Sequence, residues 1–205
     1  VSAADIVNSA SLDDLTSIIR EFGEERHARR IAQEIVATRD AAPITRTLAL
    51  AEMIAEVMPK SRGPRGKGKG KHKGQHRPER IHPATRTFQA LRIYVNDEIG
   101  ELRRGLAAAE RLLGVGGRLV VVSFHSLEDR EVKRFLQARS GNVPRAHRHS
   151  PAAEATEQTP SFDLLFRGAV KPSQAEIDAN PRARSARLRA ARRTSAPAWQ
   201  AEDAA

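Results

Sequence analysis

The residues best suited to acid–base chemistry follow directly after an apolar run, residues 119–122. They are Ser123, His125 and Ser126. The imidazole of His125 titrates near neutral pH in its ordinary state, which makes it the best candidate in the chain for a general base or a base-orienting group. A structural interpretation competes with this one, because Ser126 and Asp129 have the spacing of a helix capping box and His125 could simply pack.

A second group of polar residues lies along one flank of a long helical pattern. Apolar residues recur every three or four positions from residue 83 to residue 113, which predicts one continuous amphipathic helix. Gln89, Arg92 and Asn96 share the flank of that stripe. A polar flank alone is more often a solvated face than a binding surface. Asp97 and Glu98 are expected to be solvated.

Residues 60–80 form a basic segment in which cations alternate with five glycines and Glu79 is the one acid. Such a composition buries too little apolar surface to order itself, so we expect a flexible loop. The density of cations favours contact with phosphates, which is salt-sensitive and independent of base sequence. A solvated linker is the alternative. The candidate substrate-binding cations are Lys67, Lys69, Lys71 and Lys73.

The composition limits the class of protein. Thirty-five basic and 25 acidic residues give a formal charge of +10, which points to a polyanionic partner, usually nucleic acid. The chain has no cysteine, so disulfides and thiolate metal sites are excluded, and a cytoplasmic location is expected. No apolar run reaches membrane-spanning length. We expect no metal site, because the loop histidines lack nearby acids at ligand spacing (His72, His76, His147 and His149).

The first part of the chain, residues 1–59, has the pattern of a small helical module. Ser11 and Asp14 predict the start of a first helix, which Gly23 would end. A second helix is expected over residues 24–39. A third would follow Pro43, capped by Thr45 or Thr47, and end at Pro59.

The second part of the chain has an α/β pattern. The continuous apolar run at residues 118–124 predicts a central parallel strand that is covered on both faces. A helix should follow from residue 126, with further strands at 162–170 and 185–192 and a short helix at 174–179. This order suggests half of a doubly wound sheet, short of neighbouring strands, and hence an incomplete fold. The tail from Thr194 is expected to be disordered.

Four long motifs resemble one known family. They are residues 82–93 (HPATRTFQALRI) followed by Asn96-Asp97-Glu98, residues 117–130 (GRLVVVSFHSLEDR), residues 180–189 (NPRARSARLR), and residues 23–32 (GEERHARRIA). These motifs resemble the RsmH (MraW) family of ribosomal RNA methyltransferases. The similarity covers about residues 2–193 and is far more specific than a lone glycine-rich motif.

The resemblance implies an enzyme that uses S-adenosylmethionine to methylate the exocyclic N4 of a cytosine in the decoding region of 16S rRNA. It implies a Rossmann-like class I methyltransferase domain with an all-α insertion. On that basis residues 1–59 are the helical insertion domain, 60–80 the basic flexible loop, 81–193 the C-terminal half of the methyltransferase domain, and 194–205 a disordered tail.

The family's glycine-rich turn, its acidic ribose-binding residue and its donor-binding motif have no counterpart in these residues. Gly66, Gly68 and Gly70 alternate with lysines and do not follow a predicted strand. We therefore expect no cofactor-binding residue in this chain, and we expect it to be a fragment that is inactive alone.

The resemblance also suggests partners and rival functions. It makes 16S rRNA or the small ribosomal subunit the expected partner, with Gln89, Arg92 and Asn96 reading a base edge or binding phosphate. The target base would have to be single-stranded or flipped out. No membrane partner is expected, and the sequence does not decide between a monomer and a homodimer. The alternatives are a non-catalytic basic RNA-binding or ribosome-associated module, and a partial gene product without function.

Overall fold

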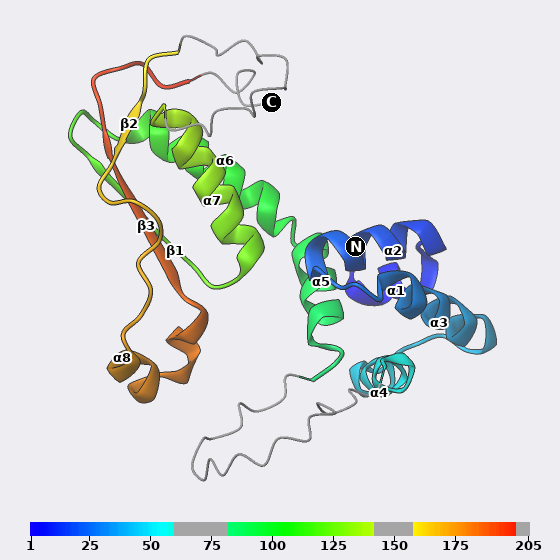
Figure 1. Cartoon of the computed structure of the whole chain (residues 1–205). Coiled ribbons are helices and arrows are strands. Elements are labelled where there is room, and N and C mark those ends of the chain that lie inside the picture. Colours follow the sequence, from blue (N-terminus) through cyan, green and yellow to red (C-terminus); the bar gives the residue numbers. More distant parts are fainter. Residues whose placement is uncertain (60–81, 142–157, 200–205) are drawn as a thin grey trace, which may run out of the picture. The chain divides into compact units, whose positions relative to one another are not determined.

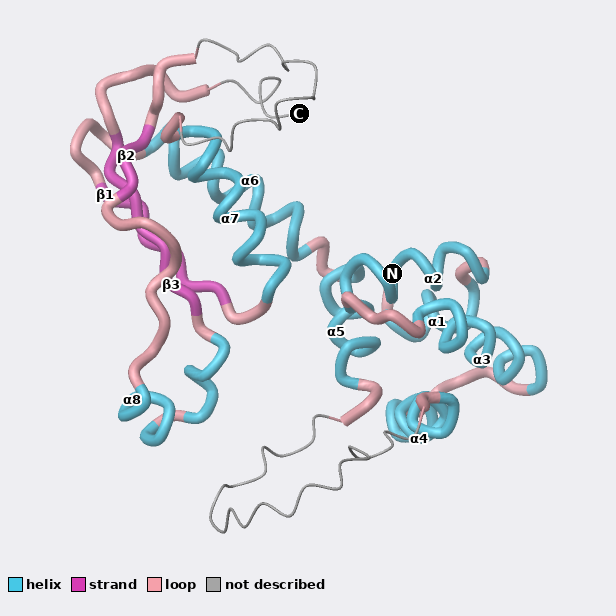
Figure 2. Tube along the Cα trace, viewed as in Figure 1, coloured by secondary structure: helices cyan, strands magenta, loops and turns pink. Residues whose placement is uncertain are grey.

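The computed structural model describes residues 1–59, 82–141 and 158–199 and divides them into two compact units (Figures 1 and 2). The helical unit contains residues up to Glu98, and the sheet unit contains the residues from Ile99 onward. Each unit is described by itself. The predicted flexible loop at residues 60–80, with Lys67, Lys69, Lys71 and Lys73, lies outside the described residues. None of the helices in the described ranges is long and apolar enough to cross a membrane.

Five helices build the described part of the helical unit, and their apolar faces meet in one core. They are α1 (Ala3–Ser9), α2 (Leu12–Gly23), α3 (Ala28–Ala41), α4 (Thr47–Val57) and α5 (Thr85–Val95). The core contains fully buried Leu15, Ile19, Ile31, Ile35 and Ile54. The three helices predicted within residues 1–59 are confirmed as α2, α3 and α4, and α1 was not predicted.

The helix starts follow the capping rules only in part. Ser11 caps α2 as predicted, with its side chain accepting from the Asp14 amide at 3.0 Å. The missed helix α1 has a complete capping box, because Ser2 and Asp5 each accept from the other's backbone amide. The predicted threonine cap of α4 is wrong, since Arg46 precedes that helix without a side-chain cap.

A close crossing of α2 and α5 places α5 in the helical unit. A Cβ atom added at Gly23 would lie 2.7 Å from the backbone oxygen of Arg86, so only glycine permits this approach. Leu91 on α5 is buried in the same core. The sequence boundary at residue 81 grouped α5 with the methyltransferase half, whereas its packing groups it with residues 1–59.

The long helix predicted over residues 83–113 is divided in two. α5 ends at Val95, and α6 runs over Glu98–Leu112. Between them Asp97 adopts a left-handed backbone conformation with φ of 47°. Asn and Asp tolerate this conformation better than other non-glycine residues, and their side chains compete for backbone hydrogen bonds. The apolar spacing continues across the break, and for that reason periodicity alone missed it.

The sheet unit contains three strands in the order β1-β3-β2. Strand β1 is Arg118–Ser123, β2 is Phe162–Leu164 and β3 is Arg187–Arg193. The central strand β3 is antiparallel to both neighbours, so β1 and β2 run parallel to each other. Helix α7 (Ser126–Arg139) joins β1 to β2 in a β–α–β order, while α8 (Gln174–Ala179) and the 3-10 helix η1 (Pro181–Ser185) precede β3.

Helices α6 and α7 cover one face of this sheet (Figure 1). Leu119 and Val121 of β1 pack with Leu106 and Leu136 from the two helices. The alternate residues Val120 and Val122 are 54% and 48% exposed. The strand at residues 118–124 is therefore confirmed, but the prediction that its neighbour is parallel and that both faces are covered is wrong for the described residues.

A buried polar cluster closes the far end of this core. The Glu110 carboxylate on α6 accepts from Arg139 at 2.6 Å, from the Ser161 hydroxyl at 2.6 Å and from the Trp199 amide at 3.2 Å. The Trp199 indole N–H donates to the Thr159 oxygen at 3.1 Å. Residues 194–199 are thus held against the core, and the expectation of disorder from Thr194 does not apply to them.

Candidate functional site

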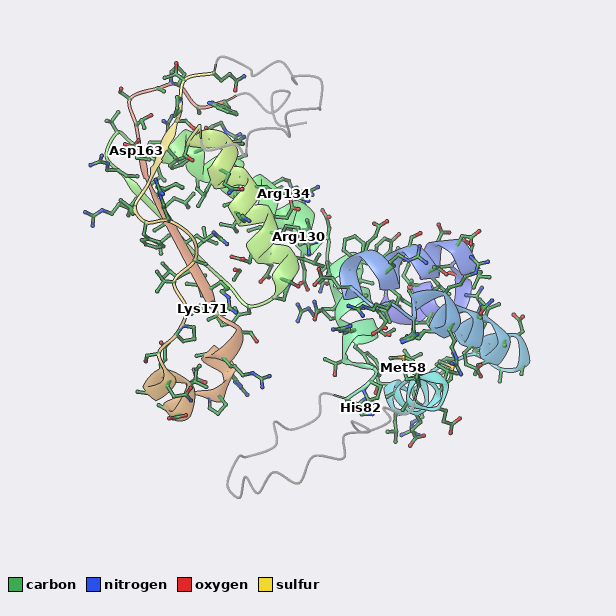
Figure 3. All side chains as sticks on the ribbon, viewed as in Figure 1. Met58, His82, Arg130, Arg134, Asp163 and Lys171 are labelled. Atoms are coloured by element: carbon green, nitrogen blue, oxygen red, sulfur yellow. The ribbon has the colours of Figure 1, made fainter. Side chains whose placement is uncertain are left out.

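Two separate groups of predicted residues occupy the two units. In the helical unit, the start of α5 lines an open pocket of about 480 Å³. Its lining comprises His82, Thr85, Phe88, Gln89 and Arg92, and Figure 3 labels His82 at the beginning of this segment. The structure therefore brings together two of the three predicted flank residues.

The side chains of this pocket suit a planar, polar ligand. Phe88 provides an aromatic ring for stacking, and the Gln89 amide can donate and accept hydrogen bonds on a base edge. Asn96 does not line the pocket, because it lies at the end of α5 as the C-cap residue. Phe88 is partly buried against the helical core, and it reaches the pocket because it lies at the edge of that core.

The guanidinium of Arg92 is oriented by Glu98. Arg92 Nε lies 2.7 Å from Glu98 Oε1, and Nη2 lies 3.0 Å from Oε2, which is a bidentate pair. The Asn96 amide donates to the same carboxylate at 3.4 Å. The expectation of a solvated Glu98 is therefore wrong. Because the pair neutralises Arg92, this guanidinium is better suited to orienting a ligand than to attracting phosphate.

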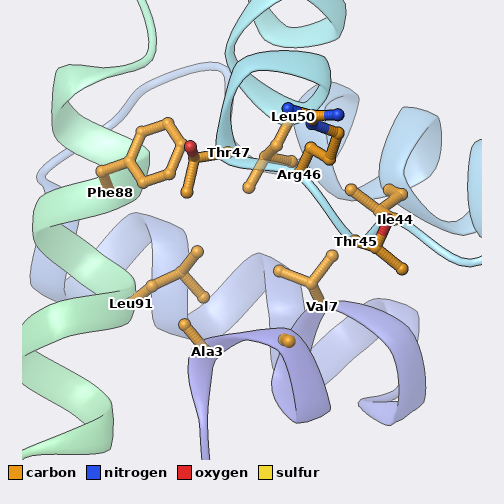
Figure 4. A pocket seen from close by; sticks show the side chains of 10 residues that line it. Ala3, Val7, Ile44, Thr45, Arg46, Thr47, Leu50, Phe88 and Leu91 are labelled. Carbon is orange, nitrogen blue, oxygen red and sulfur yellow. The ribbon is translucent and has the colours of Figure 1, made fainter.

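A second cavity in the helical unit is apolar and small (Figure 4). It has room for about 80 Å³ between α1, α4 and α5. Its lining includes Val7, Ile44, Leu50, Phe88 and Leu91. Ligand pockets usually measure about 300–1,000 Å³, so this cavity is a packing gap rather than a binding site.

In the sheet unit the predicted catalytic residues lie at the carboxyl end of β1, as expected. His125 is the N-cap of α7, and its Nδ1 accepts from the Glu128 amide at 3.4 Å. Ser126 is the first residue of α7, so the prediction that Ser126 caps the helix is wrong. Buried Ser123 donates to the Arg187 oxygen at 3.3 Å and ties β1 to β3.

The protonation pattern around His125 is set by the helix start. Its Nδ1 accepts a hydrogen bond, so in the neutral ring the proton is on Nε2. That atom lies 3.2 Å from Glu128 Oε1. The hydrogen bond from His125, helped by the Phe124 amide, lowers the pKa of Glu128 although burial opposes the shift. His125 Nε2 is buried in this arrangement and faces the Glu128 carboxylate.

Asp129 has a different role from the predicted capping box. Its two carboxylate oxygens lie 2.7 and 3.0 Å from Arg189 Nε and Nη2. This half-buried bidentate pair joins the first turn of α7 to the central strand. The sequence predicted a strand here but gave no signal for the partner of Arg189.

The described residues do not form a cradle for a methyl donor at the end of β1. The turn from β1 to α7 contains no glycine. The amides of Phe124 and Glu128, which face this turn, are already bound by the Glu128 carboxylate and His125 Nδ1. A nucleotide-like ligand needs free amides and close backbone approach at such a turn. A nucleotide-like methyl donor therefore does not fit the turn from β1 to α7.

Comparison with known proteins gives a consistent result. A family model described as the MraW methylase family matches residues 1–194. A protein of Rhodospirillum centenum is 57% identical over 204 residues, which are all of this chain and 57% of that protein. One of Paramagnetospirillum magneticum is 54% identical over 199 residues, or 97% and 58% of the two chains.

A third relative, from Caulobacter vibrioides, is 51% identical over 200 residues, which are 98% of this chain and 59% of that protein. All three relatives bear the name ribosomal RNA small subunit methyltransferase H. The chain thus spans little more than half the length of the curated relatives it matches.

Proposed function

Because the chain belongs to the MraW methylase family, we propose that it acts in the methylation of small-subunit ribosomal RNA. The observation that carries this proposal is the family match along residues 1–194, together with relatives that are named for this reaction. In its finer form the reaction is transfer of a methyl group from S-adenosylmethionine to the N4 amine of a cytosine in the decoding region.

The residues of this chain would hold the RNA base. The Phe88 ring would stack on a flipped-out cytosine, and the Gln89 amide would read its edge. Arg92 lines the same pocket and is held by Glu98, so its guanidinium would help to orient the base. Positioning of this kind supplies much of the rate when the methyl donor is already reactive.

The fold fits an α/β methyltransferase in its order of elements. A β–α–β unit of parallel strands, here β1, α7 and β2, is the building block of Rossmann-like sheets. We propose that the sheet unit is the C-terminal half of such a domain and that residues 1–59 are an insertion in it.

S-adenosylmethionine, when bound, supplies the electrophilic methyl group. The turn after β1 has no glycine, and its Phe124 and Glu128 amides are already bound, so we expect the 205-residue chain alone to bind this donor negligibly in titration calorimetry. Saturable binding would overturn the claim that the donor site lies outside these residues.

The reaction is best tested in a chimera. These 205 residues replace their counterpart in the Rhodospirillum centenum protein, which is 57% identical over that stretch. We expect the chimera to methylate small ribosomal subunits from a strain that lacks this methylation, and nucleoside mass spectrometry to find N4-methylcytidine. An inactive chimera beside an active parent would contradict the proposal. If the 205-residue chain also bound the subunits, a non-catalytic RNA-binding module would be the better description.

The basic loop has its own test. Replacing Lys67, Lys69, Lys71 and Lys73 with Ala should weaken salt-sensitive binding of rRNA by the chain, measured by fluorescence anisotropy. Unchanged binding would make the loop a linker.

A further inference from the structure

One part of the sheet unit forms a closed arm with a cationic tip. Val170 and Leu188 exchange two backbone hydrogen bonds of 2.9 Å, which close the base of the segment between them. This segment, residues 170–188, contains α8 and η1 and lies beyond one end of the strands (Figure 1). We call it the arginine arm.

Local hydrogen bonds fix the backbone at the tip of the arginine arm. The Asn180 side chain caps η1 by accepting from the Arg182 amide at 3.2 Å, and Pro181 occupies its first turn. Ala183 between the two arginines is buried, whereas Arg182 and Arg184 are exposed. Both guanidinium groups are therefore presented to solvent from a defined backbone, at much lower entropic cost than from a flexible loop.

The arm's cations lack carboxylate partners. Among the described residues, Lys171, Arg182 and Arg184 form no ion pair, and Arg187 donates to the neighbouring Ala186 oxygen. Figure 3 labels Lys171 near the base of the arm. The arm's two acids lie on α8, where Asp178 accepts from Gln174.

Two other exposed arginines of the sheet unit, Arg103 and Arg192, are neutralised by carboxylates. Arg103 pairs with Glu131 at 2.8 Å, and Arg192 pairs with Asp163 at 3.3 Å. Pairs of this kind occupy guanidinium donors that would otherwise bind an external anion. Arg182 and Arg184 differ from Arg103 and Arg192 in that their donors are not occupied by a carboxylate of the described residues, and they belong to one short segment that Asn180 caps.

We propose that the arginine arm binds the sugar–phosphate backbone of the RNA substrate, through residues other than those of the base pocket and of the basic loop. The proposal rests on the proposed function, which supplies RNA as the polyanion. A guanidinium offers a planar fork of donors that matches a phosphate. Contacts to phosphate position a nucleic acid without reading its sequence, so the arm sets how the RNA lies and not which base is chosen.

The test compares two double variants of the chain that each remove two charges. R182Q/R184Q changes the arm, and R111Q/K133Q changes exposed cations on α6 and α7. Binding of a labelled small-subunit rRNA fragment is measured by anisotropy across a series of KCl concentrations. A plot of log K against log salt falls with a slope whose magnitude decreases by about 0.7–0.9 for each phosphate contact that is lost. We therefore expect R182Q/R184Q to reduce the magnitude of the slope by roughly 1.5. Its binding at 0.1 M salt should be about 10- to 50-fold weaker than that of the wild type.

The control R111Q/K133Q should keep the wild-type slope within roughly 0.5. Glu176→Gln, which removes an acid from the arm, should tighten binding. Thermal unfolding of R182Q/R184Q should match the wild type, since neither side chain contributes to the core. Equal slopes for the two double variants would overturn the arm's role. So would a loss of affinity for a polyaspartate peptide without a loss for RNA, which would make the arm a protein-docking surface.

The same variant placed in the chimera separates this inference from the proposed function. If R182Q/R184Q raises KM for the ribosomal subunit with little change in kcat, both stand. If the chimera is inactive while the arm variant of the chain still loses RNA affinity, the proposed methylation fails and the arm's role remains. If the wild-type chain binds no RNA, the arm's role fails.

Discussion

The imidazole of His125 lies between the end of β1 and the first turn of α7, and it contacts Glu128 with both of its nitrogens. Its Nδ1 caps the helix and its Nε2 lies beside Glu128 Oε1 at 3.2 Å. A capping role and a chemical role therefore use different atoms of one ring, and a suitable substitution can separate them.

We expect His125→Asn to retain the cap, because an Asn side chain accepts from the same amide, and His125→Ala to lose it. The Ala variant should cost about 0.5–2 kcal/mol of unfolding free energy in urea, and the Asn variant much less. If Nε2 serves the reaction, the Asn variant in the chimera should lower kcat while its stability stays near that of the parent. Full activity of His125→Asn would show that the ring is only a cap.

Glu128 makes the sheet unit sensitive to acid. Its pKa in the folded protein lies below the ordinary value of 4.5, chiefly because His125 and the Phe124 amide hydrogen-bond to the carboxylate. A lowered folded pKa adds stability above about pH 4.5, and this contribution is lost as the pH falls through the folded pKa. Glu128→Gln should therefore be less stable than the wild type at pH 7, and the difference should shrink at pH 3. A difference that stays constant between these pH values would contradict this account.

At the scale of elements, the crossing of α2 and α5 depends on one missing Cβ. Gly23→Ala forces that atom to within 2.7 Å of the Arg86 oxygen, so the helices must separate. We expect a loss of about 1–3 kcal/mol in unfolding free energy. The matched control is Gly105→Ala in α6, where an added Cβ meets nothing within 4 Å; it should gain up to about 1 kcal/mol from helix propensity. A neutral Gly23→Ala would show that α5 can move away at little cost.

Much of the element order could be predicted from local pattern. Ser11 correctly predicted the start of α2, and the short helix α8 lies at the predicted residues 174–179. Local signals fail where two of them conflict. The apolar spacing across Asn96 and Asp97 favoured one helix, while the preference of those residues for left-handed and capping conformations divided it.

The candidate site was predictable in its residues but not in its partners. The position of Ser123, His125 and Ser126 at the end of β1 could be predicted, because ligand-facing residues of α/β folds follow strands. The bidentate pairs of Arg92 with Glu98 and of Arg189 with Asp129 could be identified only from the structure. In the second pair, 60 positions separate the partners, and no local pattern connects them.

At the scale of the whole molecule, charge is divided unevenly along the chain. The described residues of the helical unit carry eight basic and twelve acidic side chains, whereas those of the sheet unit carry sixteen and eight. Residues 60–81 add nine basic residues and one acid. The overall charge of +10 therefore comes from the sheet unit and the basic segment, and RNA should be attracted there.

The two units also have separate cores, and this separation can be measured. Glu110→Gln leaves Arg139 buried without a charged partner, so we expect a loss of about 3–5 kcal/mol. Its control, Glu101→Gln, breaks the exposed pair with Arg104 and should cost less than about 1 kcal/mol. Hydrogen exchange should show the loss from Glu110→Gln concentrated beyond residue 98 and that from Gly23→Ala before it. Uniform loss along the chain would contradict separate cores.

The position of Trp199 gives this molecule a built-in optical probe. It is the only tryptophan in the chain, and Arg139 lies 5.2 Å from its ring, within the cluster around Glu110. The only tyrosine, Tyr94, lies in the helical unit against Phe22. Light at 295 nm excites tryptophan alone. The emission therefore reports on residues 194–199 of the sheet unit and not on the helical unit. Release of residues 194–199 is thereby visible in unlabelled protein as a change in emission wavelength.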